Sequence, residues 1–165
     1  MGAAWHVCLI RSTQMAGEES EQLVKVFFEL EQDEDGYPPV TCESMWATPV
    51  GNGLYRLGNI PFFASGVAYE DVVSAVRRDD GTRGFVEVVR PSGHSTLRVI
   101  VYEASEVPAL RQELEALGCD TELSHIPNLM AVDVPPAVPL DSVRSLLETG
   151  TASERWEYEE ACLGR

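Results

Sequence analysis

The alternation of apolar and polar residues divides the chain into a strand-rich first part and a second part that mixes strands with helices. In residues 22–32 (QLVKVFFELEQ) one register is wholly apolar and the other is mixed, which predicts a half-buried strand. Turn-forming residues then separate short strands at intervals of about 8–12 residues, as is typical of a small antiparallel barrel or a strongly bent sheet. Further strands of this kind are expected at 40–50, 54–59, 70–80 and 83–92.

The pattern changes in the C-terminal part of the chain. Residues 95–104 are nearly all apolar, which predicts a central strand covered on both faces. Helical spacing follows, with Ser105 as the expected N-cap and Gly118 just beyond the C-terminal end. Two short strands, a second helix ending at Gly150 and an acidic edge strand over 153–163 complete the order β-α-β-β-α-β, which is the ferredoxin-like pattern.

The predicted fold is therefore α+β. We expect a small antiparallel β-barrel-like half over 22–94 to pack on a ferredoxin-like (βαββαβ) half over 95–163. Residues 1–21 are expected to form a flexible N-terminal segment, because 11–22 is polar and lacks periodicity.

Composition adds a strong acidic bias. The 165 residues include 27 Asp and Glu against 12 Lys and Arg, for a net charge of −15. Nucleic acids and anionic membranes need neutralising Lys and Arg, so neither is an expected partner. No apolar run approaches the roughly 18–20 residues that cross a bilayer. The N-terminus also lacks the positively charged region of a signal peptide, so we expect a cytoplasmic protein.

The basic residues are concentrated in one part of the chain. Residues 51–101 contain six arginines against five acids. Solvent-facing strand positions would account for them, and a locally positive surface for an anionic small ligand or an acidic peptide is the sharper interpretation. The six are Arg56, Arg77, Arg78, Arg83, Arg90 and Arg98.

Neither the cysteines nor the histidines indicate a metal site. The cysteines at positions 8, 42, 119 and 162 contain no C-x-x-C pair and are interpreted as small buried apolar residues. His6, His94 and His125 are scattered, without the spacing of a metal motif. We therefore expect no metal and no cofactor.

The loop GNIPFFASGVAYEDVV (58–73) has more apolar side chains than a surface connection needs. On extended backbone Phe62 and Phe63 point to opposite sides, so we expect one in the core and one at a groove between the two halves. The loop either plugs the barrel or forms the aromatic wall of a pocket. In the second case Phe62, Phe63, Asn59 and Trp46 are ligand-binding candidates.

The turn PSGHST (91–96) is the second candidate site. Its backbone amides and hydroxyls could cradle an anion beside Arg98, although a hairpin connection with local hydrogen bonds explains the same composition. His94 is a candidate general base, since imidazole titrates near neutral pH. The candidate anion ligands in the turn are Ser92, Gly93, Ser95 and Thr96.

Two carboxylates are the third candidate. Glu43 and Asp71 lie near aromatic residues on predicted strands, and a partly buried carboxylate with a raised pKa can act as an acid or a base. Sequence spacing does not establish whether the two side chains meet.

Several of these motifs resemble the pattern of a family of small, mainly actinobacterial and proteobacterial proteins described only as a domain of unknown function. The motifs are Trp-Ala, Tyr-Arg-Leu-x-Asn-Ile-Pro-Phe, Asp-Val-Val and Ser-Gly-x-Ser-Thr, and the resemblance covers about 24–134. Glu70 departs from it, because a glycine often precedes the Asp in that family. The resemblance implies no activity. The matching positions are Trp46, Ala47, Tyr55, Leu57, Asn59, Ile60, Pro61, Phe62, Asp71, Ser92, Gly93 and Thr96.

Two functional hypotheses follow. One is a small acidic binding or accessory protein, such as an immunity or self-protection partner, that holds a peptide, a protein or a small ligand at the groove between the halves. The other is a small cofactor-independent enzyme that uses Asp71 or Glu43 for acid/base chemistry on an anionic metabolite. Both leave a homodimer open. We find no catalytic triad, metal motif or cofactor loop in the sequence.

Overall fold

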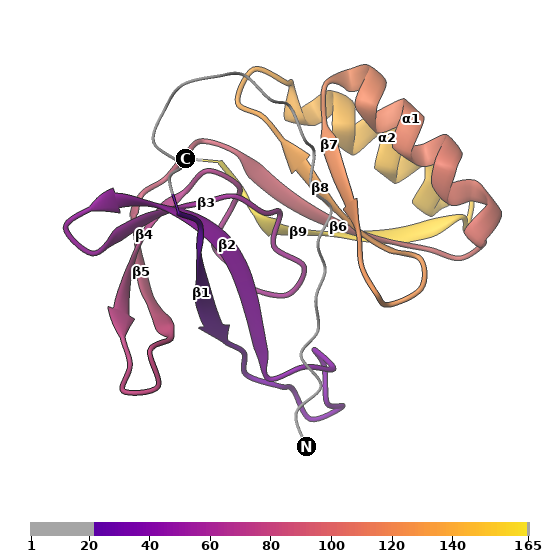
Figure 1. Ribbon diagram of the computed structural model, residues 1–165. Helices are drawn as coiled ribbons and strands as arrows, with labels where there is room; N and C mark the ends of the chain where they lie inside the picture. Colours follow the sequence, from indigo (N-terminus) through magenta and orange to yellow (C-terminus); the bar gives the residue numbers. More distant parts are fainter. Residues whose placement is uncertain (1–21, 165) are drawn as a thin grey trace.

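Five short strands close into a barrel in the first part of the chain (Figure 1). The structure is a computed structural model and describes residues 22–164, so the predicted flexible segment 1–21 lies outside the described residues. Neighbouring strands pair in antiparallel fashion, whereas the closing pair, β1 with β5, is parallel. Strand alternation predicts each strand but not this closing seam. The strands are β1 (Val24–Glu29), β2 (Cys42–Gly51), β3 (Leu54–Leu57), β4 (Val72–Arg77) and β5 (Arg83–Arg90).

The interior of the barrel follows from the alternation of side chains along the strands. Val26 and Phe28 of β1 are buried, and Phe28 stacks on Phe85 of β5 with the ring centroids 4.5 Å apart. The loop between β3 and β4 supplies Ala64 and Val67 to the same core. That loop is therefore part of the barrel interior, as the plug interpretation expects.

The second part of the chain forms a four-stranded antiparallel sheet with the order β7-β8-β6-β9. Its elements follow the predicted β-α-β-β-α-β order, and β9 is the expected edge strand. Both helices lie on the face of this sheet that is turned away from the barrel (Figure 1). The elements are β6 (Ser95–Val101), the short turn η1 (Ala104–Glu106), α1 (Val107–Leu117), β7 (Asp120–Leu123), β8 (Leu129–Val134), α2 (Leu140–Ala152) and β9 (Trp156–Cys162).

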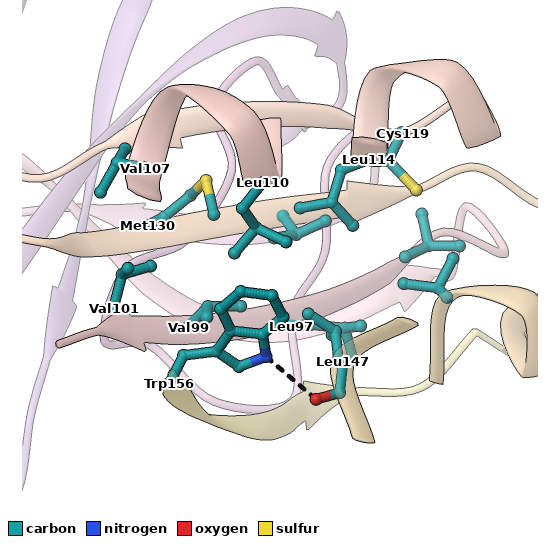
Figure 2. Close-up of a cluster of buried hydrophobic side chains, with 13 residues drawn as sticks. Leu97, Val99, Val101, Val107, Leu110, Leu114, Cys119, Met130, Leu147 and Trp156 are labelled. Atoms are coloured by element: carbon teal, nitrogen blue, oxygen red, sulfur yellow. Dashed lines mark hydrogen bonds between the residues drawn. The ribbon is translucent and has the colours of Figure 1, made fainter. Parts of the chain in front are cut away.

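The core between the helices and the second sheet is apolar. Leu110 and Leu114 of α1 pack over β6 and β8, beside the ring of Trp156 (Figure 2). The indole N–H of Trp156 donates a hydrogen bond of 2.9 Å to the carbonyl of Leu147, so this large side chain is buried with its polar atom satisfied.

The opposite face of the second sheet is more polar and is covered by the loop between β3 and β4. Thr96 and Arg98 of β6 bond to loop carbonyls, and Glu122 of β7 contacts a loop amide. Strand β6 is therefore covered on both faces, as its composition predicts, and of its residues only Ile100 is exposed.

Three local predictions need correction. Ser105 lies in the turn η1, and the N-cap position of α1 is Glu106. Helix α2 does not end at Gly150 but continues to Ala152, and Gly150 is the point where the helix passes closely over the Trp156 ring. Cys42 is exposed rather than buried, since it stands on the outer side of β2, whereas Cys119 is buried as expected.

Within residues 22–164, no helix has both the length and the apolar character that a membrane crossing requires.

Candidate functional site

Glu43 of β2 anchors the loop between β3 and β4. Its carboxylate accepts three backbone N–H hydrogen bonds, from Phe62 at 2.7 Å, Phe63 at 3.0 Å and Ala64 at 2.8 Å. Both carboxylate oxygens are therefore occupied by the loop. This arrangement fixes three consecutive peptide groups that have no strand partner, and it makes Glu43 a structural anchor of the loop.

Asp71 fixes the other end of the same loop. Its side chain is only 3% exposed and accepts hydrogen bonds from the amides of Ala68 at 2.9 Å and Ser92 at 2.7 Å. The bond to Ser92 ties the loop to the turn that leads into β6. Glu43 and Asp71 thus bind different parts of the loop, and within residues 22–164 no hydrogen bond joins the two carboxylates.

The hydroxyls of the turn 91–96 have partners inside the protein. Ser92 Oγ donates to the carbonyl of Tyr69 at 2.7 Å, and Thr96 Oγ1 donates to the carbonyl of Val67 at 3.3 Å. Ser95 Oγ accepts the amide of Gly164 at 2.8 Å. These bonds make the turn a structured connection between the two sheets. It is not the hairpin with local hydrogen bonds of the plainer interpretation, because β5 and β6 lie in different sheets and these partners are 23 to 69 residues away. Gly93 has φ +85°, the left-handed conformation that favours glycine.

Asn59 and Trp46 also have structural roles in the described residues. Asn59 Oδ1 accepts the amide of Trp46 at 2.7 Å, which joins the start of the loop to β2. The Trp46 ring is half-buried, and Lys25 of the paired strand β1 lies 4.9 Å from its centroid. Its neighbours Met45 and Ala47 are buried, so Trp46 lies on the outer side of the barrel wall.

His94 pairs with a buried carboxylate. Its Nδ1 lies 2.8 Å from Oδ1 of Asp133, which is 1% exposed on β8, and its ring contacts Tyr69 edge-on at 5.5 Å. Burial raises the pKa of Asp133, and the hydrogen bond from His94 lowers that pKa in part. Asp133 was not among the predicted residues, although an acid inside the otherwise apolar run LMAVDV is a visible signal.

Glu70, which departs from the family resemblance, has an unusual backbone conformation. Its φ of +63° lies in the left-handed region, where glycine is favoured over other residues. The glycine that often occupies this position in the resembling family is therefore explained by the left-handed bend that precedes Asp71. In this chain the Glu70 carboxylate lies 3.9 Å from Nε2 of His94.

Arg98 is the buried cation between the barrel and the second sheet. It is 5% exposed and donates from Nη2 to the carbonyl of Ala64 at 2.6 Å and from Nη1 to Glu159 of β9 at 2.9 Å. Its Nε–H has no acceptor within residues 22–164. A buried guanidinium with one unpaired N–H is uncommon, because burial without a hydrogen bond costs free energy.

A pocket of about 460 Å³ opens beside Arg98, and we refer to it as the groove. Tyr37 and Phe63 form an edge-to-face pair in its wall, with ring centroids 6.3 Å apart. Burial raises the pKa of the Tyr37 hydroxyl, and the negative charge of Glu159 raises it further. The groove is lined by Glu29, Leu30, Glu31, Tyr37, Pro38, Phe63, Ser65, Arg98 and Glu159.

Of the predicted site residues, Phe63 and Arg98 line this groove. Phe63 is 8% exposed and Phe62 is half-buried, so the more buried ring of the pair is also the one in the groove wall. Most of the other groove residues come from the end of β1 and the two residues after it, from the turn 33–39 and from β9, which carry no recognisable motif. Ser65 lies in the loop that the sequence singles out, but it was not among the predicted residues. Within residues 22–164, no group of His, Cys, Asp and Glu side chains is arranged to hold a metal ion.

The model of a protein family described as "Domain of unknown function (DUF4265)" matches residues 43–158. The chain belongs to this family. The expected membership of a family without an assigned function is thereby confirmed. The matched range of this DUF4265 protein contains the loop, both of its carboxylate anchors and Arg98. The groove wall from Glu29 to Pro38 precedes that range, and Glu159 directly follows it.

The fold of this DUF4265 protein is similar to a solved structure, "Novel crystal structure of a hypothetical protein from Neisseria gonorrhoeae". The TM-score is 0.72 and the identity is 21%, over 89% of this chain and 99% of that chain. The likeness shows a shared fold. No match is found among curated proteins.

Proposed function

We propose that this protein is a small acidic binding or accessory protein that holds a peptide, a protein or a small ligand at the groove. The position of the groove carries this proposal. Its walls come from β1 and the turn 33–39 on the barrel side and from β6 and β9 of the second sheet, with Phe63 and Ser65 of the loop between them. A pocket of about 460 Å³ is within the size range of ligand sites.

The contacts of the candidate catalytic residues favour binding over the alternative, a cofactor-independent enzyme with carboxylate acid/base chemistry. A proton transfer at Glu43 or Asp71 would disturb the backbone hydrogen bonds that shape the loop. Neither residue lines the groove, and carboxylates in the groove wall would repel an anionic metabolite. The enzyme alternative therefore has neither of its two candidate acid/base residues, Glu43 or Asp71, at the pocket.

The charge of the chain supports the remaining parts of the proposal. With a net charge of −15, we expect neither nucleic acid nor an anionic membrane surface as a partner. A cytoplasmic role in immunity or self-protection, with or without a homodimer, fits a small acidic protein and belongs to the same proposal.

A peptide selection against a blocked variant tests the proposal. Ser65 is exposed in the loop and lines the groove, so Ser65→Trp would fill the groove without removing a core side chain. Ser145→Trp, at an exposed position on α2, is the matched control. Peptides selected from a random display library on the natural protein should bind the Ser145→Trp variant equally and the Ser65→Trp variant at least tenfold more weakly. Equal binding to both variants would overturn the groove as the binding site, and a failure to select any peptide would overturn the peptide form of the proposal.

A further inference from the structure

We propose that the occupant of the groove is a basic residue, lysine or arginine, within an extended peptide segment. This inference rests on the proposed function and names the chemistry of the ligand. The arginine-rich middle of the sequence suggests an anionic ligand, whereas we infer a cationic one. Of those arginines, Arg98 and Arg78 reach the groove residues, and each is already paired with a groove glutamate.

The charge balance of the groove is negative. Three glutamates line it against one arginine, and the charge of Arg98 is already offset by Glu159 at 2.9 Å. Glu29 pairs with Arg78 at 2.7 Å, whereas Glu31 forms no ion pair within residues 22–164. The nearest uncompensated charge for a ligand is therefore a carboxylate, which attracts a cation.

The apolar part of the groove fits the rest of a basic side chain. The Tyr37 and Phe63 rings, with Leu30 and Pro38, provide a wall against which the methylene groups of lysine or arginine can pack. Aromatic ring faces also attract cations, most strongly where water is excluded. An anionic ligand would gain neither of these contacts.

Arg98 indicates a peptide rather than a free amine. Its side chain is more than nine-tenths buried and lines the groove, and its Nε–H is the one buried side-chain group without an acceptor in residues 22–164. The Nε–H is shielded from solvent, so a small shift of the guanidinium towards the groove is needed before an occupant can accept its hydrogen bond. A backbone carbonyl is a neutral acceptor that would then satisfy this group without competing for Glu159. A segment with a carbonyl next to a basic side chain offers both groups together.

The charge of the whole molecule acts in the same direction. A net charge of −15 concentrates cations near the surface and repels polyanions over a distance of about one Debye length, or ~10 Å at 0.1 M salt. We therefore expect the affinity for a basic peptide to fall as the salt concentration rises.

The test uses three blocked tripeptides that differ in one side chain: acetyl-Ala-Arg-Ala-amide, its neutral citrulline analogue and its glutamate analogue. Binding is followed by amide chemical shifts in NMR titrations at low salt. The arginine peptide should shift the amides of Glu31 and Ser65 and bind at least tenfold more tightly than the citrulline peptide. Glu31→Gln should weaken arginine-peptide binding about threefold, and Glu113→Gln on the exposed face of α1 should leave it unchanged.

The outcomes separate this inference from the proposed function. If the citrulline or the glutamate peptide shifts the groove amides as strongly as the arginine peptide, the groove remains a binding site and the cationic inference is overturned. The same holds if none of the three peptides shifts these amides while library peptides discriminate between the Ser65→Trp and Ser145→Trp variants. If the library peptides also fail to discriminate, the proposed function is overturned as well.

Discussion

At the scale of single residues, Glu43 does more for the loop than any other side chain. Its two oxygens accept the amides of three consecutive residues, Phe62, Phe63 and Ala64, none of which has a strand partner. Hydrogen bonds to a charged group contribute about 1.5–3 kcal/mol each, and an unsatisfied buried amide costs about as much. The conformation of the loop therefore depends on the carboxylate of Glu43, which lies outside the loop, on β2.

Glu43→Gln should lower the free energy of unfolding by about 2–3 kcal/mol. The NH₂ group of glutamine would replace one acceptor oxygen, so that a hydrogen-bond donor would face the backbone N–H groups of the loop. Urea unfolding measures this change. The control is Glu87→Gln on the exposed side of β5, for which we expect a change below about 0.5 kcal/mol. A loss at Glu43 no larger than at Glu87 would contradict the anchoring role.

The sequence identifies the important carboxylates of the loop, but it does not show what they bind. Glu43 and Asp71 attract attention as carboxylates beside aromatics, and both are structurally important. Their partners, however, lie up to 21 residues away in the chain, in the aperiodic loop for Glu43 and also in the turn 91–96 for Asp71. Asp133 was missed for the same reason, because its partner His94 lies 39 residues away.

At the scale of elements, local sequence patterns predict every described strand and both helices. The alternation in 22–32 correctly predicts which side of β1 is buried, and the helical spacing after 105 correctly predicts the buried side of α1. The parallel seam of the barrel and the path of α2 depend on contacts between distant segments. Sequence patterns of single elements therefore cannot show them.

Gly150 is the clearest case at this scale. Glycine is common just beyond the end of a helix, and yet α2 continues through Gly150 to Ala152. The glycine is explained by packing, since a Cβ at this position would overlap the ring of Trp156. Gly150→Ala should lower the free energy of unfolding by about 1–3 kcal/mol despite the better helix propensity of alanine, as expected for overpacking. Thermal or urea unfolding measures it.

The control in the same helix is Ser145→Ala, whose side chain is exposed, with an expected change within about 0.5 kcal/mol. Unchanged or increased stability of the Gly150→Ala variant would mean that α2 does not pass closely over Trp156.

At the scale of the whole molecule, the loop and a layer of acidic side chains lie between the barrel and the second sheet. The sequence predicted a groove between two halves and two of its residues, Phe63 and Arg98. It could not identify Tyr37 or Glu159 as their neighbours, because a turn and an edge strand meet there only after both sheets have formed. A positive surface, which is one of the two interpretations of the arginine-rich segment, does not describe the groove, where glutamates predominate.

Glu122, one of the acidic side chains between the barrel and the second sheet, makes the stability of the protein depend on pH in a definite direction. Burial raises the pKa of Glu122, and the charges of Glu43, Asp120 and Asp133 raise it further, while the amide of Ile60 lowers it in part. A carboxyl whose pKa is higher in the folded than in the unfolded state is destabilising when ionised. Its contribution to stability therefore improves as pH falls through the folded pKa towards the ordinary value of about 4.3.

Glu122→Gln removes this titration and keeps an oxygen that can accept the amide of Ile60. At pH 8 the variant should be more stable than the natural protein, and the difference should vanish towards pH 4. Urea unfolding between pH 4 and pH 8 measures it, with the exposed Glu113→Gln on α1 as a control that should show no pH-dependent difference. If the stability difference between the variant and the natural protein is constant, or grows as pH falls, the ionised Glu122 carboxylate does not destabilise the folded protein through its burial between the two sheets.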